Sequence, residues 1–117
     1  AYSHCIAHGY NLAMGLEQQK AAVNSGHWPL FRYNPDLAKT GKNPFQLDSK
    51  APSMELEKYI YNETRFKMLS LSQPELARQL LTEAQNDVAV RWQLYSYLAN
   101  MQCCADAGEA AKSEASE

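Results

Sequence analysis

The residues with the greatest chemical potential in this 117-residue chain lie near its start. The run SHCIAHG at residues 3–9 contains Cys5 between His4 and His8. A cysteine thiolate is a soft ligand that suits iron-sulfur clusters or zinc. A cluster needs four such ligands, so a metal-binding role for Cys5 requires three further cysteines from outside this sequence. The alternative for a single cysteine is a small buried residue that packs beneath a sheet.

Zinc is a second possibility, because it takes four nitrogen or sulfur ligands in a tetrahedron. His4, Cys5 and His8 would then combine with the adjacent pair Cys103 and Cys104, but their spacing matches no finger or ribbon pattern. We therefore expect the two histidines to be surface or hydrogen-bonded residues and the late cysteines to be incidental. Three cysteines, two of them adjacent, do not form a secreted disulfide framework, which indicates a reducing, cytoplasmic environment.

Other kinds of catalytic site find little support in the sequence. Ser70 and Ser72 have no neighbouring histidine to act as a base, and there is no Gly-rich phosphate loop. The carboxylates Glu55, Glu57 and Glu63 are expected to lie on a solvated helix face. Aromatic residues near prolines usually lock a loop against neighbouring helices rather than stack on a ligand. We expect this packing role for Trp28, Phe31, Tyr33 and Phe45.

We expect Cys5 to lie at the end of a short strand, just before a turn. Residues 1–6 alternate in type and are expected to form the second half of a strand, so the chain is expected to begin in mid-element. Cys5 and His4 would then point to opposite faces and could not share one ligand. A helix is predicted over residues 12–25, capped by Asn11 and stopped by Gly26.

The middle of the chain is predicted to be irregular. Residues 28–33 can give at most a short edge strand, because Pro29 lacks a backbone donor. Asn34-Pro35 and the segment GKNP at residues 41–44 predict turns, with one helical turn over residues 36–39 and an extended segment at residues 45–47.

Two longer helices are predicted after residue 52. The first begins at the cap Ser53 and runs to about residue 70, and the second begins with a capping box at residues 72–75 and ends near residue 102. Apolar residues of the second helix fall on one stripe: Leu76, Leu80, Ala84, Val88, Trp92, Tyr95 and Ala99. Residues 103–117 have no large apolar side chain and are expected to form a disordered tail.

Composition limits the fold and the partners. Val and Ile together number five, too few for a buried parallel sheet. We therefore predict a mostly helical α+β fragment with a short strand remnant and three main helices. Lys and Arg number 11 against 13 Asp and Glu, with the signs interspersed, so nucleic acid is not expected as a partner. No apolar run is long enough to span a membrane, and no signal segment begins the chain.

Five segments, in this order, resemble the C-terminal end of pyruvate:ferredoxin (flavodoxin) oxidoreductase. They are AYSHCIAHG at residues 1–9, GLEQQKAAV at 15–23, GHWPLFRYNP at 26–35, GKNPFQLDSK at 41–50 and NETRF at 62–66. The final helix also fits, and the resemblance ends near residue 101. It implies that residues 1–102 are the last part of a thiamine-diphosphate-binding α/β domain, and that Cys5 is the remote fourth ligand of the 4Fe-4S cluster nearest to thiamine.

The resemblance also implies the activity of the parent enzyme. Members of the family are multidomain homodimers that oxidatively decarboxylate pyruvate with coenzyme A, form acetyl-CoA, and pass electrons through iron-sulfur clusters to ferredoxin or flavodoxin. Their thiamine diphosphate and magnesium motif and their catalytic residues lie upstream of the segment matched here. We therefore expect no catalytic residue in this chain and no activity from it alone. The competing hypothesis is a free-standing helical module that binds a protein partner without catalysis.

Overall fold

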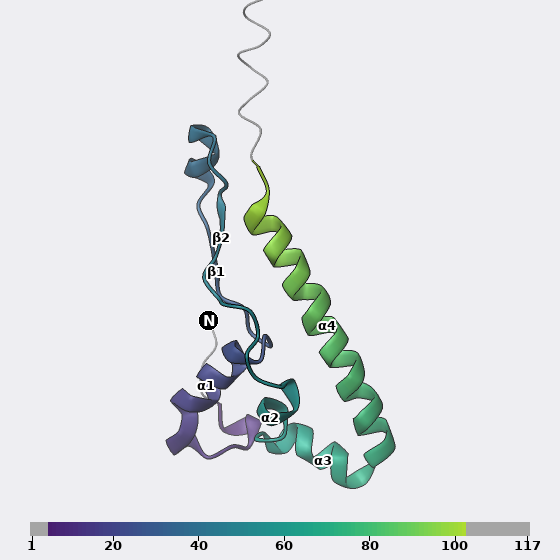
Figure 1. Ribbon diagram of the computed structural model, residues 1–117. Helices are drawn as coiled ribbons and strands as arrows, with labels where there is room; N and C mark the ends of the chain where they lie inside the picture. The colour runs from purple at the N-terminus through teal and green to yellow at the C-terminus, as the bar shows by residue number, and fades with distance from the viewer. Residues whose placement is uncertain (1–4, 103–117) are drawn as a thin grey trace, which may run out of the picture.

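The computed structural model describes residues 5–102 and shows a helical base from which a thin arm projects (Figure 1). The base contains α1 (Gly15–Asn24), α2 (Leu56–Ile60) and α3 (Thr64–Ser72). The arm is a hairpin of β1 (Phe31–Tyr33) and β2 (Phe45–Leu47), with the 3-10 helix η3 (Pro35–Thr40) at its tip. The long α4 (Pro74–Asn100) starts at the base and runs back beside the hairpin. The described part is thus mostly helical with a small antiparallel sheet, which agrees with the predicted α+β fragment.

The predicted strand over residues 1–6 does not extend to its expected end. Cys5 has an extended backbone, but Ile6 already begins the 3-10 helix η1 (Ile6–His8). Gly9 ends this turn with a left-handed backbone at φ 68°. The first four residues and the predicted tail at 103–117 lie outside the described part of the chain.

The predicted first helix is present, but its α-helical part covers residues 15–24 rather than 12–25. The side chain of Asn11 accepts a hydrogen bond from the Ala13 amide at 3.0 Å, and a 3-10 turn η2 (Leu12–Met14) leads directly into α1. Gly26 follows α1 with φ 74°, a conformation that favours glycine. A Cβ atom at Gly26 would lie 2.8 Å from Val88 Cγ1, so the chain also passes α4 too closely for a side chain.

The predicted short strand and extended segment form the hairpin. The two strands pair antiparallel with Phe31 opposite Leu47 and Tyr33 opposite Phe45. A helical turn occupies the tip, as expected, although it runs over residues 35–40 rather than 36–39. The Asn43 side chain donates to the carbonyl oxygens of Leu98 and Ala99 at 2.7 and 3.0 Å. It therefore caps the last turn of α4, where the Leu98 carbonyl also accepts from the Met101 amide at 3.4 Å, and ties the arm to that helix.

The prediction of one helix over residues 53–70 is wrong, because the segment breaks into α2 and α3. Ser53 is not a cap: its amide donates to the Asn24 carbonyl at 2.9 Å and so ties the loop to the end of α1. The first helix ends at Ile60, and Glu63 has an extended backbone before α3 begins. The break turns the Glu63 side chain into the protein, where it has no exposed surface.

The predicted long helix is confirmed as α4, but its capping box is wrong. The hydroxyl of Ser72 donates to the Met68 carbonyl at 3.0 Å and therefore belongs to the end of α3. Gln73 takes the cap position without a side-chain hydrogen bond, and Pro74 starts the helix. Of the predicted apolar stripe, Val88 is buried, whereas Leu76 and Leu80 are about 40% exposed.

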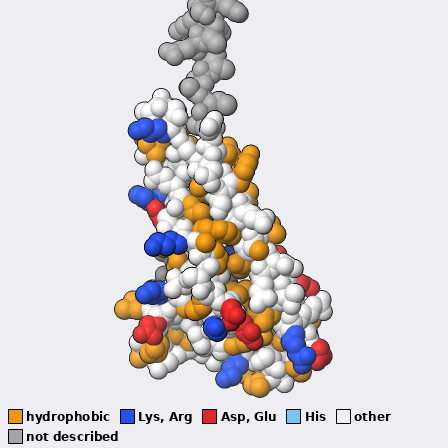
Figure 2. All heavy atoms as spheres, viewed as in Figure 1, with side chains coloured by type: hydrophobic (Ala, Val, Ile, Leu, Met, Phe, Trp, Pro, Cys, Tyr) orange, Lys and Arg blue, Asp and Glu red, His pale blue; other side chains and the backbone are white. Residues whose placement is uncertain are grey.

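A small core joins α1, α2 and α4. Its buried members are Ala22, Leu56, Tyr59, Ile60 and Val88. On the arm, Phe31, Phe45 and Tyr95 form an aromatic cluster, with ring centroids 5.2 to 5.9 Å apart. Apolar side chains also remain on the surface along the hairpin and α4, as Figure 2 shows. None of the described helices is both long and apolar enough to cross a membrane.

Candidate functional site

The Cys5 turn (residues 5–9) lies on the surface of the base. Cys5 is exposed and its thiol is free. The turn is closed by hydrogen bonds from the His8 amide to the Cys5 carbonyl and from the Gly9 amide to the Ile6 carbonyl, each at 3.2 Å. The sulfur is therefore accessible on the surface of the described part of the chain.

The structure tests the zinc alternative only in part. His8 is half-buried, and its ring lies 6.2 Å from that of Tyr10. His4, Cys103 and Cys104 lie outside the described residues. Within residues 5–102, no group of three His, Cys, Asp or Glu side chains is arranged to hold a metal ion.

The Cys5 turn is attached to the start of α3. The Gly9 carbonyl accepts hydrogen bonds from both the amide of Thr64, at 3.1 Å, and its side-chain hydroxyl. A Cβ atom at Gly9 would lie 2.7 Å from Thr64 Cβ. Glycine is therefore required here twice, by the positive φ and by the close approach of the helix.

A polar network surrounds Glu63, the residue that precedes Thr64. It consists of Gln18, Tyr59, Asn62, Glu63 and Arg65. Gln18 donates to Glu63 Oε1 at 3.1 Å and to the Tyr59 carbonyl at 3.3 Å. Asn62 donates to Gln18 Oε1 at 3.2 Å, and Arg65 Nε donates to Glu63 Oε2 at 2.6 Å. The prediction that Glu63 lies on a solvated face is therefore wrong, because these donors replace the water that the carboxylate loses on burial.

The network keeps Glu63 ionised. Burial alone would raise the pKa of Glu63, but the hydrogen bonds from Gln18 and Arg65 and the positive charge of Arg65 outweigh it. The pKa therefore lies below its ordinary value of 4.5. The carboxylate is a structural anion at neutral pH and has no tendency to act as a general acid.

His27 lies against Tyr59, with the two ring centroids 4.8 Å apart. Burial and the nearby positive charge of Arg91 lower the pKa of His27 from its ordinary value of 6.5. Its backbone carbonyl accepts a hydrogen bond from Arg91 Nη1 at 3.3 Å. His27 is thus held neutral where the loop after α1 meets α4.

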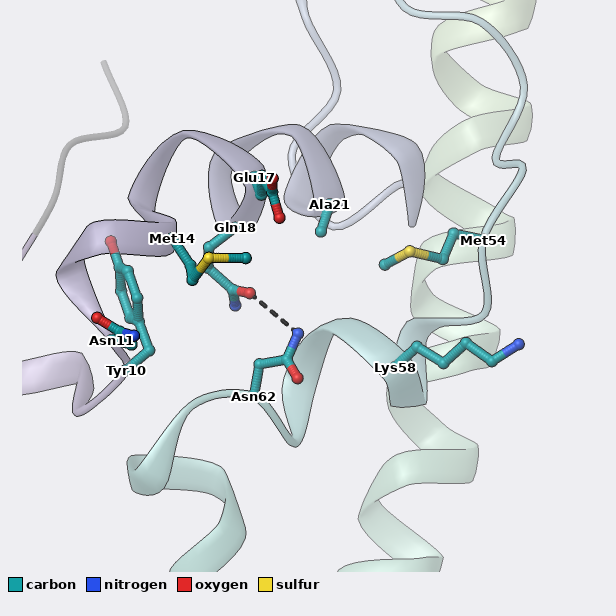
Figure 3. A pocket seen from close by; sticks show the side chains of 9 residues that line it. All are labelled: Tyr10, Asn11, Met14, Glu17, Gln18, Ala21, Met54, Lys58 and Asn62. Carbon is teal, nitrogen blue, oxygen red and sulfur yellow. Dashed lines mark hydrogen bonds between the residues drawn. The ribbon is translucent and has the colours of Figure 1, made fainter.

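A cavity of about 380 Å³ opens beside the polar network (Figure 3). The hydrogen bond between Asn62 and Gln18 crosses it between α1 and the loop that follows α2. Its polar groups include these two amides and the carboxylate of Glu17, whereas the amine of Lys58 points away from the cavity and pairs with Glu55 at 2.9 Å. The lining residues are Tyr10, Asn11, Met14, Glu17, Gln18, Ala21, Met54, Lys58 and Asn62.

The aromatic residues singled out in the sequence do not gather around this cavity. Phe31 and Phe45 pack on Tyr95 of α4, as expected for residues that lock a loop against a helix. Trp28 and Tyr33 are exposed, by 39% and 63%. The structure therefore separates the arm, with its aromatic contacts, from the base, which carries Cys5 and the polar network.

No protein-family model matches the chain. Over 99 residues, or 85% of its length, the chain is 62% identical to the pyruvate-flavodoxin oxidoreductase of Trichormus variabilis, and over 100 residues it is 58% identical to that of a Nostoc species. It is 43% identical over 99 residues to the pyruvate:ferredoxin oxidoreductase of Moorella thermoacetica. The chain spans only 8% of the length of each of these proteins. It is thus similar, over most of its own length, to a short part of pyruvate-flavodoxin and pyruvate:ferredoxin oxidoreductases.

Proposed function

We propose that this chain is a structural part of a pyruvate:ferredoxin or pyruvate:flavodoxin oxidoreductase. The observation that carries the proposal is 62% identity over 99 residues to an enzyme of that name, of which those residues cover 8%. A high identity over a short share of a much longer relative is typical of a segment that works inside a larger protein. The remainder of that enzyme would then be the main partner of this chain.

In this proposal, the parent enzyme oxidises and decarboxylates pyruvate with coenzyme A and transfers the electrons to ferredoxin or flavodoxin. Thiamine diphosphate, magnesium and 4Fe-4S clusters would be bound largely by residues outside this chain. Residues 1–102 would complete the thiamine-diphosphate-binding domain of a cytoplasmic homodimer. The chain's own contribution would be structural, apart from one metal ligand.

That ligand is Cys5. Its thiol is exposed and free at the start of a surface turn, so iron held by another part of the enzyme can reach it. A single accessible thiolate fits the role of one ligand whose three companions come from elsewhere. When bound, the cluster would supply one-electron transfer, and Cys5 would join the base of this chain to that electron path.

An apolar surface favours the second candidate function, a helical module that binds a protein partner without catalysis. Val90, Leu94 and Tyr97 recur at helical spacing on α4 and are 51% to 67% exposed. The two candidates differ in what the Cys5 sulfur does. A cluster ligand needs it, whereas an interaction surface on α4 does not.

Replacement of Cys5 in the full-length enzyme tests the proposal. We expect Cys5→Ser to lose the electron paramagnetic resonance signal of one reduced cluster and part of the protein-bound iron. Cys103→Ser is the matched control, because the resemblance ends before residue 103, and it should leave both unchanged. A full complement of iron and an unaltered spectrum in Cys5→Ser would remove the ligand assignment and favour the interaction module.

A further inference from the structure

The Cys5 turn lacks the apolar anchoring that usually fixes a surface segment. None of the residues of η1 is buried, and Ile6 is 83% exposed. The hydrogen bonds inside the turn fix its shape but not its position on the protein. Something outside the turn must therefore set where the Cys5 sulfur lies.

The attachment to Thr64 supplies this position. Thr64 is the first residue of α3, and its amide is one of the donors that a helix N-terminus leaves without a helical partner. The Gly9 carbonyl accepts from that amide at 3.1 Å and from the Thr64 hydroxyl as well. The turn that carries Cys5 therefore caps α3. The two donors of Thr64, its amide and its hydroxyl, fix the position of the Gly9 carbonyl.

The position of Thr64 is fixed by the hydrogen bonds of the residue that precedes it. The preceding residue, Glu63, is fully buried and is bonded to Gln18 of α1 and to Arg65. The N-terminus of α3 is consequently fixed relative to α1 by directional hydrogen bonds. A continuous series of contacts thus runs from Gln18 through Glu63 and Thr64 to Gly9 and the Cys5 turn.

We infer that Thr64 is the positioning residue for Cys5, and that its hydroxyl sets the geometry with which the Cys5 sulfur meets iron. This inference rests on the proposed function, since the cluster is bound mainly by other parts of the enzyme. Thr64 does not touch the metal. It acts through the Gly9 carbonyl and the closed turn between Gly9 and Cys5.

The test uses the full-length enzyme, purified without oxygen, with three variants. Thr64→Val keeps the branched shape and the backbone amide but replaces the hydroxyl by a methyl group that crowds the Gly9 carbonyl. Thr64→Ser keeps the hydroxyl and is the rescue control. Gly9→Ala perturbs the same contact from the other side, because its Cβ would lie 2.7 Å from Thr64 Cβ.

Two measurements besides activity report on the position of the turn. One is amide hydrogen exchange of residues 5–10, and the other is the resonance spectrum of the reduced cluster together with the rate at which bathophenanthroline removes its iron. Loss of one hydrogen bond in Thr64→Val should increase the rate of amide exchange and the rate of iron removal by about fivefold each. The iron content before chelation should stay that of the wild type, the spectrum of one cluster should shift, and Thr64→Ser should behave as the wild type.

The outcomes separate the two proposals. If Cys5→Ser changes a cluster but Thr64→Val and Gly9→Ala leave its spectrum and iron release unchanged, the positioning role is refuted and the ligand assignment stands. If Thr64→Ser is as impaired as Thr64→Val, the hydroxyl is not responsible and the inference also fails. If Cys5→Ser leaves all clusters intact, the ligand assignment in the proposed function fails, and the positioning role fails with it.

Discussion

Replacement of Glu63 by glutamine tests whether the buried polar network holds the base of the fold together. Both carboxylate oxygens of Glu63 accept hydrogen bonds, Oε1 from Gln18 at 3.1 Å and Oε2 from Arg65 at 2.6 Å. Glutamine offers one acceptor and one amino group, so one donor must face another donor in either orientation of its amide. Gln18 cannot relieve this by rotating its own amide without losing its bonds to Tyr59 and Asn62.

The size of the stability loss follows from how deeply the two donors, Gln18 and Arg65, are buried. An unsatisfied buried donor costs about 1–3 kcal/mol, and the lost charge-assisted bond adds a comparable amount. Arg65 is 38% exposed and can partly regain water, so its share is reduced. We therefore expect Glu63→Gln to lower the free energy of unfolding by about 2–3 kcal/mol.

Amide hydrogen exchange of α1, α2 and α3 in the full-length enzyme measures this change as a local free energy of unfolding, because the chain by itself is expected to melt over a broad range. Glu83→Gln is the matched control, because Glu83 is exposed in the middle of α4, and its effect should stay within about 0.5 kcal/mol. A Glu63→Gln variant as stable as this control would show that the carboxylate is dispensable and would refute the reasoning.

The remaining predictions address the junction of α1 with α4, the arm, the effect of pH and the stability of the whole chain. Gly26→Ala should lose about 2–4 kcal/mol in the same measurement, since the new Cβ combines a positive φ with a 2.8 Å approach to Val88. Gly41→Ala, which has φ 70° at an exposed position, is its control and should lose less. Asn43→Ala should lose about 1–2 kcal/mol and speed amide exchange in the hairpin and the last turn of α4, whereas unchanged exchange would exclude the capping role. Because the pKa of His27 is lowered, the unfolded state binds more protons below pH 6.5, so stability should fall as the pH drops below that value, and His27→Gln should flatten the decline. Finally, the chain by itself should melt broadly at low temperature, since its core is small; a sharp transition at high temperature in calorimetry would contradict this.

The elements that were predictable from the sequence are those defined by local signals. Asn11 caps its own helix two residues on, and Gly26 takes the left-handed conformation that the end of that helix requires. The hairpin strands and α4 also have their signals in neighbouring residues. For Asn11 and Gly26 the determining interaction spans only a few positions, so one sequence is enough to infer it.

The break before α3 and the burial of Glu63 depend on contacts that no local pattern reveals. Gln18, the partner of Glu63, lies 45 residues away in the sequence. Without knowledge of that partner, a glutamate within a predicted helix is expected to face water. One local signal was present, because Asn62 and Thr64 are poor residues for the interior of a helix. Together they indicate a boundary where the apolar spacing alone suggested continuity.

The division of the fold into a base and an arm bears on how Cys5 is held. The arm is joined to α4 by the hydrogen bonds of Asn43 and by aromatic packing, which is non-directional and tolerates small shifts. The Cys5 turn is joined to α3 by the two hydrogen bonds between Thr64 and the Gly9 carbonyl, whose strength falls steeply when distance or angle changes. A metal ligand requires such a directional attachment, because its bond length leaves little freedom. Loss of the Asn43 contact in the arm should therefore leave hydrogen exchange in the Cys5 turn unchanged, and its effect on stability should add to that of Glu63→Gln, since the two changes lie in separate parts of the fold.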